Sequence, residues 1–501
     1  MFSLKKIKNI IWPIERSELR LFVPMSILML CVLFNFSALR AVKDSLVVPS
    51  IGAEVISFLK LWFVLPFAVI CTIIYVKLSN MMEMEKIFYL VVSIFLSVFL
   101  IFAYVLYPNQ ELYHPSSEFV GALVYKYPYL KWFIRILAKW SYAIIYIFAE
   151  LWSVIVINLM FWQFANHIIA TPNAKRIYPI LGMIGNIGLI FAGNSVVYFC
   201  DSTKPIFIFW RDVFSSGTNN SSEVTLKLVI TVVTISGIIA MLLLRYIHKF
   251  VLERSSGVIN PHHKLHDTQT KLSVSESVKL ILKSKYIGYV LIMIVCYGLV
   301  INILEGPWKA KIKELYPTTQ EYLSFMGNFN ICMGFSSVFF MLIGSNLLRH
   351  FDWFVSAIIT PSIMGITGSL FFIFVIFEDS FRDFWNFDKF DPIYAAVMIG
   401  ALQNILSKST KYSLFDSTKE MSYIPLSKEL RTKGKAAAEI MGAKIGKSSG
   451  ALIQSSLFMI FPTATFDSII PVLMLIFLCV ITLWIADVRK LAIEYNKIVG
   501  E

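Results

Sequence analysis

Long apolar runs separated by short polar stretches recur along the whole chain. A helix needs about 20 mostly apolar residues to cross the hydrocarbon core of a bilayer. Twelve runs reach this length, at positions 19–39, 53–77, 87–107, 132–165, 176–199, 225–247, 286–306, 321–348, 353–377, 391–416, 435–461 and 467–488. The pattern therefore predicts an all-α, polytopic membrane protein with twelve transmembrane helices.

The composition agrees with a chain buried in lipid. Hydrophobic residues make up 57% of the 501 positions and charged residues only 15%, and the mean hydropathy is +0.70. A water-soluble protein of this length would need far more polar surface to cover its domains. The composition therefore excludes the water-soluble classes of protein.

No motif in the chain indicates catalysis. The segment Gly442–Ser448 (GAKIGKS) has only three residues between its glycines, where a phosphate-binding P-loop needs four, and no strand is expected before it. His262, His263 and His266 have no carboxylate or cysteine spaced for coordination, which favours a solvated loop over a metal site. We expect no enzymatic activity, no cofactor and no bound metal.

The net charge of +13 predicts how the chain crosses the membrane. Basic residues gather before the first apolar run, between the sixth and seventh runs, and after the last run. By the positive-inside rule both termini and the central connection are cytoplasmic, which requires an even number of spans. Lys126, Lys131, Arg135 and Lys139 are an exception, because they fall on the expected outer face. The basic excess does not indicate nucleic-acid binding, since there is no soluble basic domain.

A polar stretch near the middle divides the chain into two similar halves. Residues 248–285 are rich in Pro, His, Ser and charge, which predicts a cytoplasmic linker between six-helix bundles at 1–247 and 286–501. Two halves related as repeats are typical of the major facilitator architecture. Glycines at three- or four-residue spacing support the repeat, because they let helices approach closely in lipid: Gly182, Gly185 and Gly188 are expected to correspond to Gly442, Gly446 and Gly450.

Two pairs of charged residues lie in apolar surroundings at nearly the same separation. Lys43 and Glu305 are 262 positions apart, and Glu150 and Lys411 are 261 apart, with the signs of charge exchanged between the halves. One charge at the centre of a bilayer costs about 2.5–3.5 kcal/mol. Four charges in register therefore predict a central polar site between two repeats. The alternative is a set of structural salt bridges, or of lysines that extend to the membrane surface.

Further basic residues accompany these four. Arg40 lies one turn before Lys43, and Lys309 lies one turn after Glu305. Lys444 and Lys447 lie three positions apart in a glycine-rich stretch. Several cations that converge on one cavity attract a polyanion strongly in surroundings of low dielectric constant. We expect Arg40, Lys309, Lys444 and Lys447 all to contribute to anion binding. The alternative for Lys309 is a position at the membrane surface, and for Lys444 and Lys447 a cytoplasmic loop that follows the positive-inside rule.

The segments that carry these charges are LRAVKDSLVV, FAELWSVIVINLMFWQFAN, EGPWKAKIKELYP and KYSLFDSTKEMSYIPLSKELRTKGKAAAE. With them the chain resembles, almost from end to end, the ATP/ADP translocase family of rickettsiae, chlamydiae and plastids, and the rickettsial members most of all. The resemblance implies nucleotide transport across a membrane, typically exchange of host ATP for ADP. It also implies that Lys43, Glu150, Glu305 and Lys411 are the key charged positions. The family includes members that take other nucleotides or perform net import.

The resulting prediction is an alternating-access transporter in a bacterial inner membrane. Its expected partners are nucleotides and lipid, without nucleic acid, and its expected state is a monomer. ATP/ADP exchange is the first hypothesis. The alternatives are net import of other nucleotides, a proton-coupled symporter of another organic anion with Glu150 or Glu305 as proton carrier, and a membrane enzyme or sensor that binds nucleotide without moving it.

Overall fold

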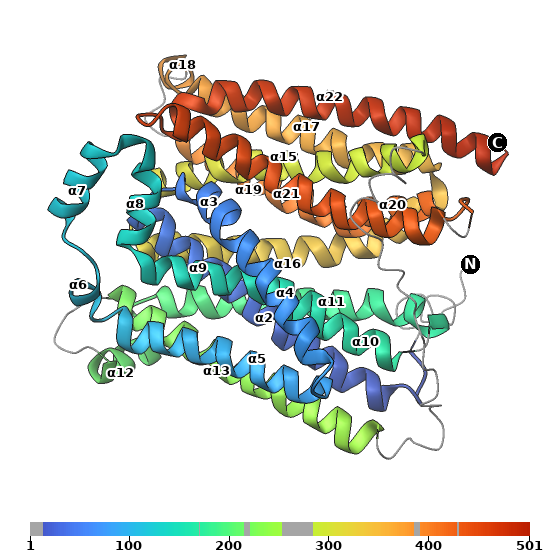
Figure 1. Cartoon of the computed structure of the whole chain (residues 1–501), viewed down its shortest axis with the longest axis horizontal. Coiled ribbons are helices and arrows are strands. Elements are labelled where there is room, and N and C mark those ends of the chain that lie inside the picture. Colours follow the sequence, from blue (N-terminus) through green and yellow to red (C-terminus); the bar gives the residue numbers. More distant parts are fainter. Residues whose placement is uncertain are drawn as a thin grey trace.

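The computed structural model is a bundle of long helices joined by loops and short helices (Figure 1). It describes residues 14–169, 171–214, 221–252, 284–384, 391–427 and 430–500, and these contain no strand. The linker expected at 248–285 and its histidine cluster lie almost wholly outside the described residues. The all-helical prediction is confirmed.

Ten long helical stretches of the described chain are apolar enough to cross a bilayer. The first six are α2 (Leu19–Ser50), α3 with α4 (Val55–Phe58 and Leu65–Ser79), α5 (Met84–Ile101), α9 with α10 (Trp140–Trp152 and Trp162–Ile168), α11 (Thr171–Cys200) and α13 (Ser221–Tyr246). The other four are α15 (Lys285–Leu315), α16 (Thr319–His350), α17 (Trp353–Ile376) and α22 (Phe466–Val499). Many of them extend several residues beyond the expected bounds.

Two further long helical stretches occupy the remaining expected spans. One consists of α19 (Pro392–Thr410), a π-helical segment (Lys411–Phe415) and α20 (Asp416–Tyr423), and the other is α21 (Lys435–Ile460). α19 packs against α17 and α16, and α21 packs against α15. They are more polar than the ten, partly because they carry lysines. The ten apolar helices and these two are consistent with twelve spans, a number that stays a prediction.

The fourth span does not begin at residue 132 as expected. The chain first forms a separate amphipathic helix, α8 (Lys131–Ala138), which packs against α3, and it turns at Lys139 before α9 begins. Lys131, Arg135 and Lys139 are spaced four apart, so they form a polar stripe that keeps this segment out of the apolar interior. The prediction of one continuous helix over 132–165 is wrong.

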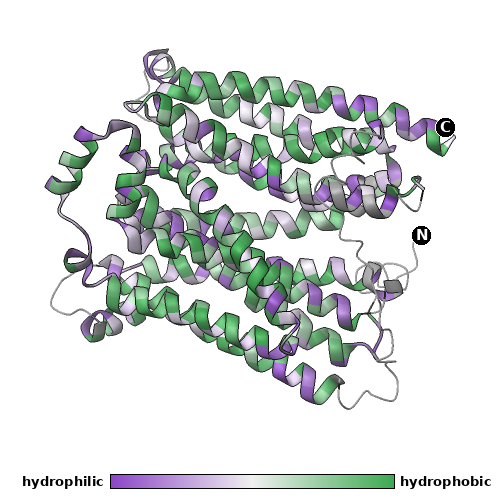
Figure 2. Cartoon of the chain, in the orientation of Figure 1, coloured by the Kyte–Doolittle hydropathy of each residue, from purple (hydrophilic) through white to green (hydrophobic). Residues whose placement is uncertain are grey.

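Both ends of the described helical chain lie at the same end of the bundle. Figure 1 shows that α2 begins, and α22 ends, at one end, whereas the short helices α6 (Gln110–Tyr113), α7 (Ser117–Lys126), α12 (Pro205–Phe214) and α18 (Glu378–Phe384) lie at the other. We call these the terminal end and the loop end. Figure 2 shows apolar residues along the long helices and polar residues concentrated towards their ends. This arrangement suits a bilayer.

The helices fall into two groups along the chain, Leu19–Leu252 and Lys285–Val499. In Figure 1 α5, α10 and α13 of the first group lie in the lower part of the view and α15, α17 and α22 of the second group in the upper part, while α3, α7 and α8 of the first group reach the level of α19 and α21. The glycine pattern predicted that the two groups are packed alike. A Cβ added at Gly188 would lie 2.6 Å from the carbonyl oxygen of Leu30 on α2, and one at Gly446 would lie 2.9 Å from that of Val295 on α15. Gly182 does not belong to the close-packed face, since the nearest atom to its added Cβ is 3.9 Å away, on Met341.

Gly446→Val is expected to destabilise the protein strongly. A Cβ at this position meets backbone atoms of α15, which cannot move aside as a side chain can. We expect a loss of about 1–3 kcal/mol, the usual cost of overpacking a core, seen as a lower melting temperature of the purified protein in detergent. Gly288→Val is the matched control: Gly288 lies on α15, the helix that Gly446 faces, and nothing lies within 4 Å of its added Cβ. Equal melting temperatures for the two variants would contradict the close approach.

Candidate functional site

Lys43 and Glu150 are brought together near the middle of the bundle. The Lys43 Nζ atom, on α2, lies 3.0 Å from Glu150 Oε1 on α9. It also lies 2.8 Å from Asp44 Oδ1 and 4.0 Å from the centre of the Tyr146 ring. Tyr146 and Glu150 are four residues apart on α9, so both side chains lie on the face turned towards α2. The Lys43 side chain is only 3% exposed, which makes this an internal ion pair rather than a surface one.

Glu305 connects the two helix groups. On α15 its carboxylate accepts from Lys60 at 2.7 Å and from Arg40 at 3.4 Å, both from the first group. Lys309, one turn further along α15, lies 3.0 Å from the same carboxylate. Lys60 also donates to the side chain of Asn302, at 3.2 Å. One carboxylate therefore holds three cations, two of which come from the opposite group.

A second ion pair between the groups lies deeper. Lys309 Nζ is 2.8 Å from Asp44 Oδ2, and both side chains are 0% exposed. This contact is an ion pair without good hydrogen-bond geometry. Lys309 is therefore buried, and it lies inside the charged cluster.

Lys411 does not contact the other three charges of the register pattern. Its Nζ atom lies 2.8 Å from Asp416 Oδ2, and 4.9 Å and 5.8 Å from the ring centres of Tyr412 and Tyr297. Residues five apart diverge on an α-helix, but a π-helical turn places them on one face. The segment Lys411–Phe415 is π-helical, and this is what pairs Lys411 with Asp416.

The same local feature lies beside Glu150. A π-helical segment, Ser153–Phe161, follows α9 directly, so both members of the Glu150–Lys411 pair lie at the junction of an α-helix and a π-helical segment. Lys60 lies in a third such segment, Leu59–Val64. π-Helical turns inside long helices are frequent at functional sites. Here they alter the register of the helix next to each charge.

Pro307 lies inside α15 without breaking it. A proline lacks the N–H that would bond the carbonyl oxygen four residues earlier, here that of Ile303. Gln454 on α21 replaces the lost donor: its Nε2 lies 2.9 Å from the Asn302 carbonyl oxygen and 3.3 Å from that of Ile303. A polar side chain on a neighbouring helix thus keeps Glu305 and Lys309 on one continuous helix.

Lys447 belongs to the surroundings of the cluster, and Lys444 has no polar contact with it. The Lys447 side chain is exposed, yet the charges that act on it include those of Glu150, Lys60 and Lys411. Lys444 is also exposed, and no hydrogen bond or ion pair joins it to the cluster within the described chain. The two expected anion-binding lysines of α21 therefore differ in their surroundings.

Exposure within the cluster increases towards the terminal end. Lys43 and Lys309 lie in the second halves of α2 and α15, which run away from that end, and are buried. Lys447 lies at the middle of α21 and is exposed. Glu150 and Lys411 lie between them and are each 29% exposed. The exposed fraction thus falls from Lys447 through Glu150 and Lys411 to the buried Lys43 and Lys309.

The loop end of the molecule is closed by contacts between the groups. Trp132 on α8 packs edge-on against Phe458 of α21, and Lys131 donates to the carbonyl oxygen of Pro462 at 3.4 Å. Gln320 on α16 donates to the carbonyl oxygen of Cys200 at 2.6 Å. The two groups are thus joined at the loop end by ring packing and hydrogen bonds.

The cluster carries a formal excess of positive charge. Its basic members are Arg40, Lys43, Lys60, Lys309, Lys408, Lys411 and Lys447. Its acidic members are Asp44, Glu150, Glu305 and Asp416. The three surplus charges favour binding of a polyanion.

The arrangement does not suit a metal ion. No group of three or more His, Cys, Asp or Glu side chains close enough to share a metal occurs in the part of the chain that the structure describes. The carboxylates of the cluster are instead bound to lysine and arginine side chains.

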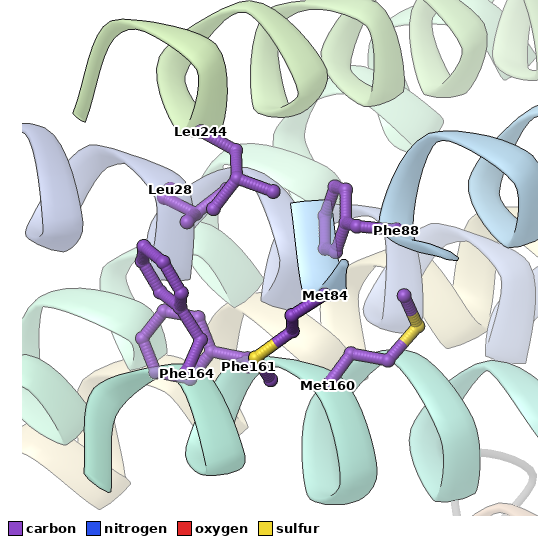
Figure 3. A pocket seen from close by; sticks show the side chains of 7 residues that line it. All are labelled: Leu28, Met84, Phe88, Met160, Phe161, Phe164 and Leu244. Carbon is purple, nitrogen blue, oxygen red and sulfur yellow. The ribbon is translucent and has the colours of Figure 1, made fainter. Parts of the chain in front are cut away.

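A separate small pocket has the opposite character. Figure 3 shows seven apolar side chains around it, those of Leu28, Met84, Phe88, Met160, Phe161, Phe164 and Leu244. It contains no charged or hydrogen-bonding side chain, so it is unsuited to a polyanion.

Two tryptophans near the charges serve the packing of the helices. The indole of Trp152 donates to the carbonyl oxygen of Val32, and that of Trp308 to the carbonyl oxygen of Val397. Both are buried, which leaves their rings no free face for a ligand. Tyr412, by contrast, is 47% exposed and lies beside Lys411.

Comparison with protein families matches residues 2–495 to the model of the TLC ATP/ADP transporter. "ADP,ATP carrier protein 3" of Rickettsia bellii is 58% identical over 496 residues, covering 99% of this chain and 98% of that protein. "ADP,ATP carrier protein 1" of Rickettsia prowazekii is 42% identical over 499 residues, again covering 99% and 98%.

Solved structures support the fold at much lower identity. A bacterial homologue of the iron transporter ferroportin in an inward-facing state superposes with a TM-score of 0.60 at 14% identity, covering 95% of this chain and 99% of that one. A D-xylose–proton symporter gives a TM-score of 0.52 at 11% identity, covering 94% and 97%. Both are transporters, and they confirm the major-facilitator-like helical fold.

Proposed function

Because the chain belongs to the TLC ATP/ADP transporter family, we propose that it carries nucleoside di- and triphosphates across the membrane, with exchange of ATP for ADP as the first reaction to test. The protein is a multi-pass membrane transporter and not an enzyme. The observation that carries the proposal is the positively charged cluster, which is buried in the bundle and built from both helix groups.

The cations of the cluster would hold the phosphates. We assign Arg40, Lys43 and Lys411 to phosphate binding, because Arg40 and Lys411 are partly exposed and the buried Lys43 pairs with the partly exposed Glu150. Lys309 and Lys447 would complete the site at its deep and exposed ends. Lys444 would attract the substrate on its way to the cluster rather than bind it there, since Lys444 is exposed and has no polar contact with the cluster.

The carboxylates would control release. Glu305 binds Arg40 and Lys60 across the two groups, so an incoming phosphate competes with it for the same cations. When the phosphate leaves, the carboxylate takes its place and lowers the cost of uncompensated charge. Glu150 would act in the same way on Lys43.

Exchange follows from this competition. The two halves, 1–247 and 286–501, would rock against each other so that the cluster opens to one side of the membrane and then to the other. Ion pairs between the groups hold one arrangement, and only a polyanion that replaces the carboxylates releases them. Movement without substrate would therefore be slow, which favours counter-exchange over net transport.

The proposed location is a bacterial inner membrane with both termini in the cytoplasm. The start of α2 and the end of α22 at one end of the bundle support an even number of crossings. The site in this structure would then open to the cytoplasm. We propose a monomer as the working unit, because the charged cluster is complete within one chain.

The proposal does not specify which nucleotide base the site prefers. The chain is 58% identical to "ADP,ATP carrier protein 3" and 42% identical to "ADP,ATP carrier protein 1" of the Rickettsia species compared. It is thus nearer to the former, so the test must span several bases. The exposed ring of Tyr412 beside Lys411 is the aromatic placed best to stack on a base.

Intact cells that express the protein are expected to take up labelled ATP. Unlabelled nucleoside di- and triphosphates, tried one base at a time, should compete, whereas inorganic anions of similar charge should not. Efflux of preloaded labelled nucleotide should accelerate at least about tenfold when nucleotide is added outside, because substrate must neutralise the cations before the halves move. The measurement is the initial rate of uptake and of efflux.

Three outcomes would contradict parts of the proposal. Efflux that is equally fast without external nucleotide would exclude obligatory exchange. Uptake that follows the proton gradient and ignores nucleotides would favour the proton-coupled symporter. Binding without uptake would favour a membrane sensor or enzyme.

A further inference from the structure

Lys408 is a cation of the cluster without a counterion. It lies on α19, one turn before Lys411, and its Nζ atom is buried without a hydrogen-bond partner. No ion pair joins it to a carboxylate within the described residues, whereas Lys43, Lys60, Lys309 and Lys411 each have one. Its ammonium group lies 5.7 Å from the centre of the Phe329 ring, which provides no anion.

The surroundings of Lys408 are repulsive. The charges that act on it most strongly are those of Arg40, Glu305, Lys309 and Lys60. Three of these are cations, and the one carboxylate, Glu305, already binds all three of them. A buried, uncompensated cation inside a membrane protein is costly. An anionic group that reaches this point would relieve that cost.

The position of Lys408 indicates which part of a nucleotide reaches it. Lys447 and Tyr412 are exposed, whereas Lys309 and the Lys408 Nζ atom are inaccessible to water. The deepest layer of the site is thus charged, and an aromatic ring lies at its exposed margin. A nucleotide would enter with its phosphates deepest, and its outermost phosphate would travel furthest.

We propose that Lys408 binds the terminal phosphate of the nucleotide and thereby determines the preference for di- and triphosphates over monophosphates. The inference rests on the proposed function and refines it. A monophosphate held by the same exposed groups ends too early to reach the buried ammonium, so it gains nothing from it. Lysine suits this role because its ammonium group is a compact charge that donates to phosphate oxygens.

Lys408→Met tests the inference, because methionine keeps most of the side-chain length and removes the charge. The inhibition constants of ATP and ADP against labelled ADP uptake should rise about tenfold or more, as expected for loss of a charge-assisted hydrogen bond. The constant for AMP should change less than about twofold. If uptake is too slow to measure, the rise in melting temperature of the purified protein with each nucleotide gives the same comparison. Lys408→Arg should restore most of the preference.

Lys77→Met is the control, since this exposed lysine on α4 forms no part of the cluster and should leave all three constants unchanged. The inference is wrong if ATP, ADP and AMP weaken by one common factor in Lys408→Met, or if none weakens. That result would leave nucleotide transport intact as the function. A wild-type protein that neither binds nor takes up any nucleotide would instead overturn both the function and this inference.

Discussion

Glu305→Gln is expected to lower the rate of nucleotide exchange by about 100-fold or more while nucleotide binding is retained or tightened. The carboxylate holds Arg40, Lys60 and Lys309, and an amide cannot neutralise them. Arg40 and Lys60 then have no internal carboxylate that could displace the substrate, whereas Lys309 keeps Asp44. Removing one partner of a buried ion pair costs about 3–5 kcal/mol, and here a bound phosphate recovers part of that cost. The substrate should therefore leave slowly.

Initial rates of uptake and equilibrium binding to the purified protein separate the two effects. Glu314→Gln is the matched control, because it makes the same change on the same helix, and Glu314 pairs with Lys311 outside the cluster. That variant should exchange nucleotide at the rate of the unmodified protein. Loss of binding together with transport in Glu305→Gln would show that Glu305 maintains the fold of the site rather than substrate release.

The sequence predicted the membrane class and most helix positions because both depend on local apolar length. It also predicted that Lys43, Glu150, Glu305 and Lys411 lie in one site, since charges are costly in lipid. The structure pairs Lys43 with Glu150 and links them to Glu305 through Asp44 and Lys309, whereas Lys411 pairs with Asp416. Whether they bind substrate is a proposal.

Lys60 was missed, and Lys408 was seen only as a neighbour of Lys411 in the tenth apolar run, for one physical reason. The search relied on charges that recur at the repeat distance, and the positions that correspond to them hold Tyr322 and Ile147. That criterion cannot identify a charged residue when the corresponding position in the other half is uncharged. Lys60 could have been found as a charge within the apolar run 53–77, whereas the burial of Lys408 Nζ depends on helices from both groups.

Two local features also depend on contacts far along the chain. A proline inside a helix usually kinks or breaks it, but α15 continues through Pro307 because Gln454, about 150 positions later, supplies a donor to the carbonyl oxygen of Ile303. The π-helical turn that pairs Lys411 with Asp416 contains no glycine or proline that would indicate it in the sequence. Neither feature can be derived from the pattern of apolar residues.

Asp44→Asn is expected to destabilise the protein more than any other single change in the cluster. Asp44 is 0% exposed and lies 2.8 Å from both Lys43 and Lys309. Its loss leaves Lys309 with Glu305 alone, which already holds two other cations. The cost of breaking such a buried pair is about 3–5 kcal/mol. The measurement is the melting temperature in detergent, together with the amount of protein that reaches the membrane.

A second substitution distinguishes this cause from general damage to the core. Lys309→Met alone should be milder, because Asp44 keeps Lys43 and Glu305 keeps Arg40 and Lys60. In the double variant, Asp44→Asn with Lys309→Met, each remaining cation keeps a carboxylate. Its melting temperature should therefore recover towards that of Lys309→Met alone. Interaction energies of contacting residues in such cycles reach about 0.5–3 kcal/mol. Purely additive losses would mean that Asp44 and Lys309 do not stabilise each other, and α2 and α15 would then be held together by packing and by Glu305 alone.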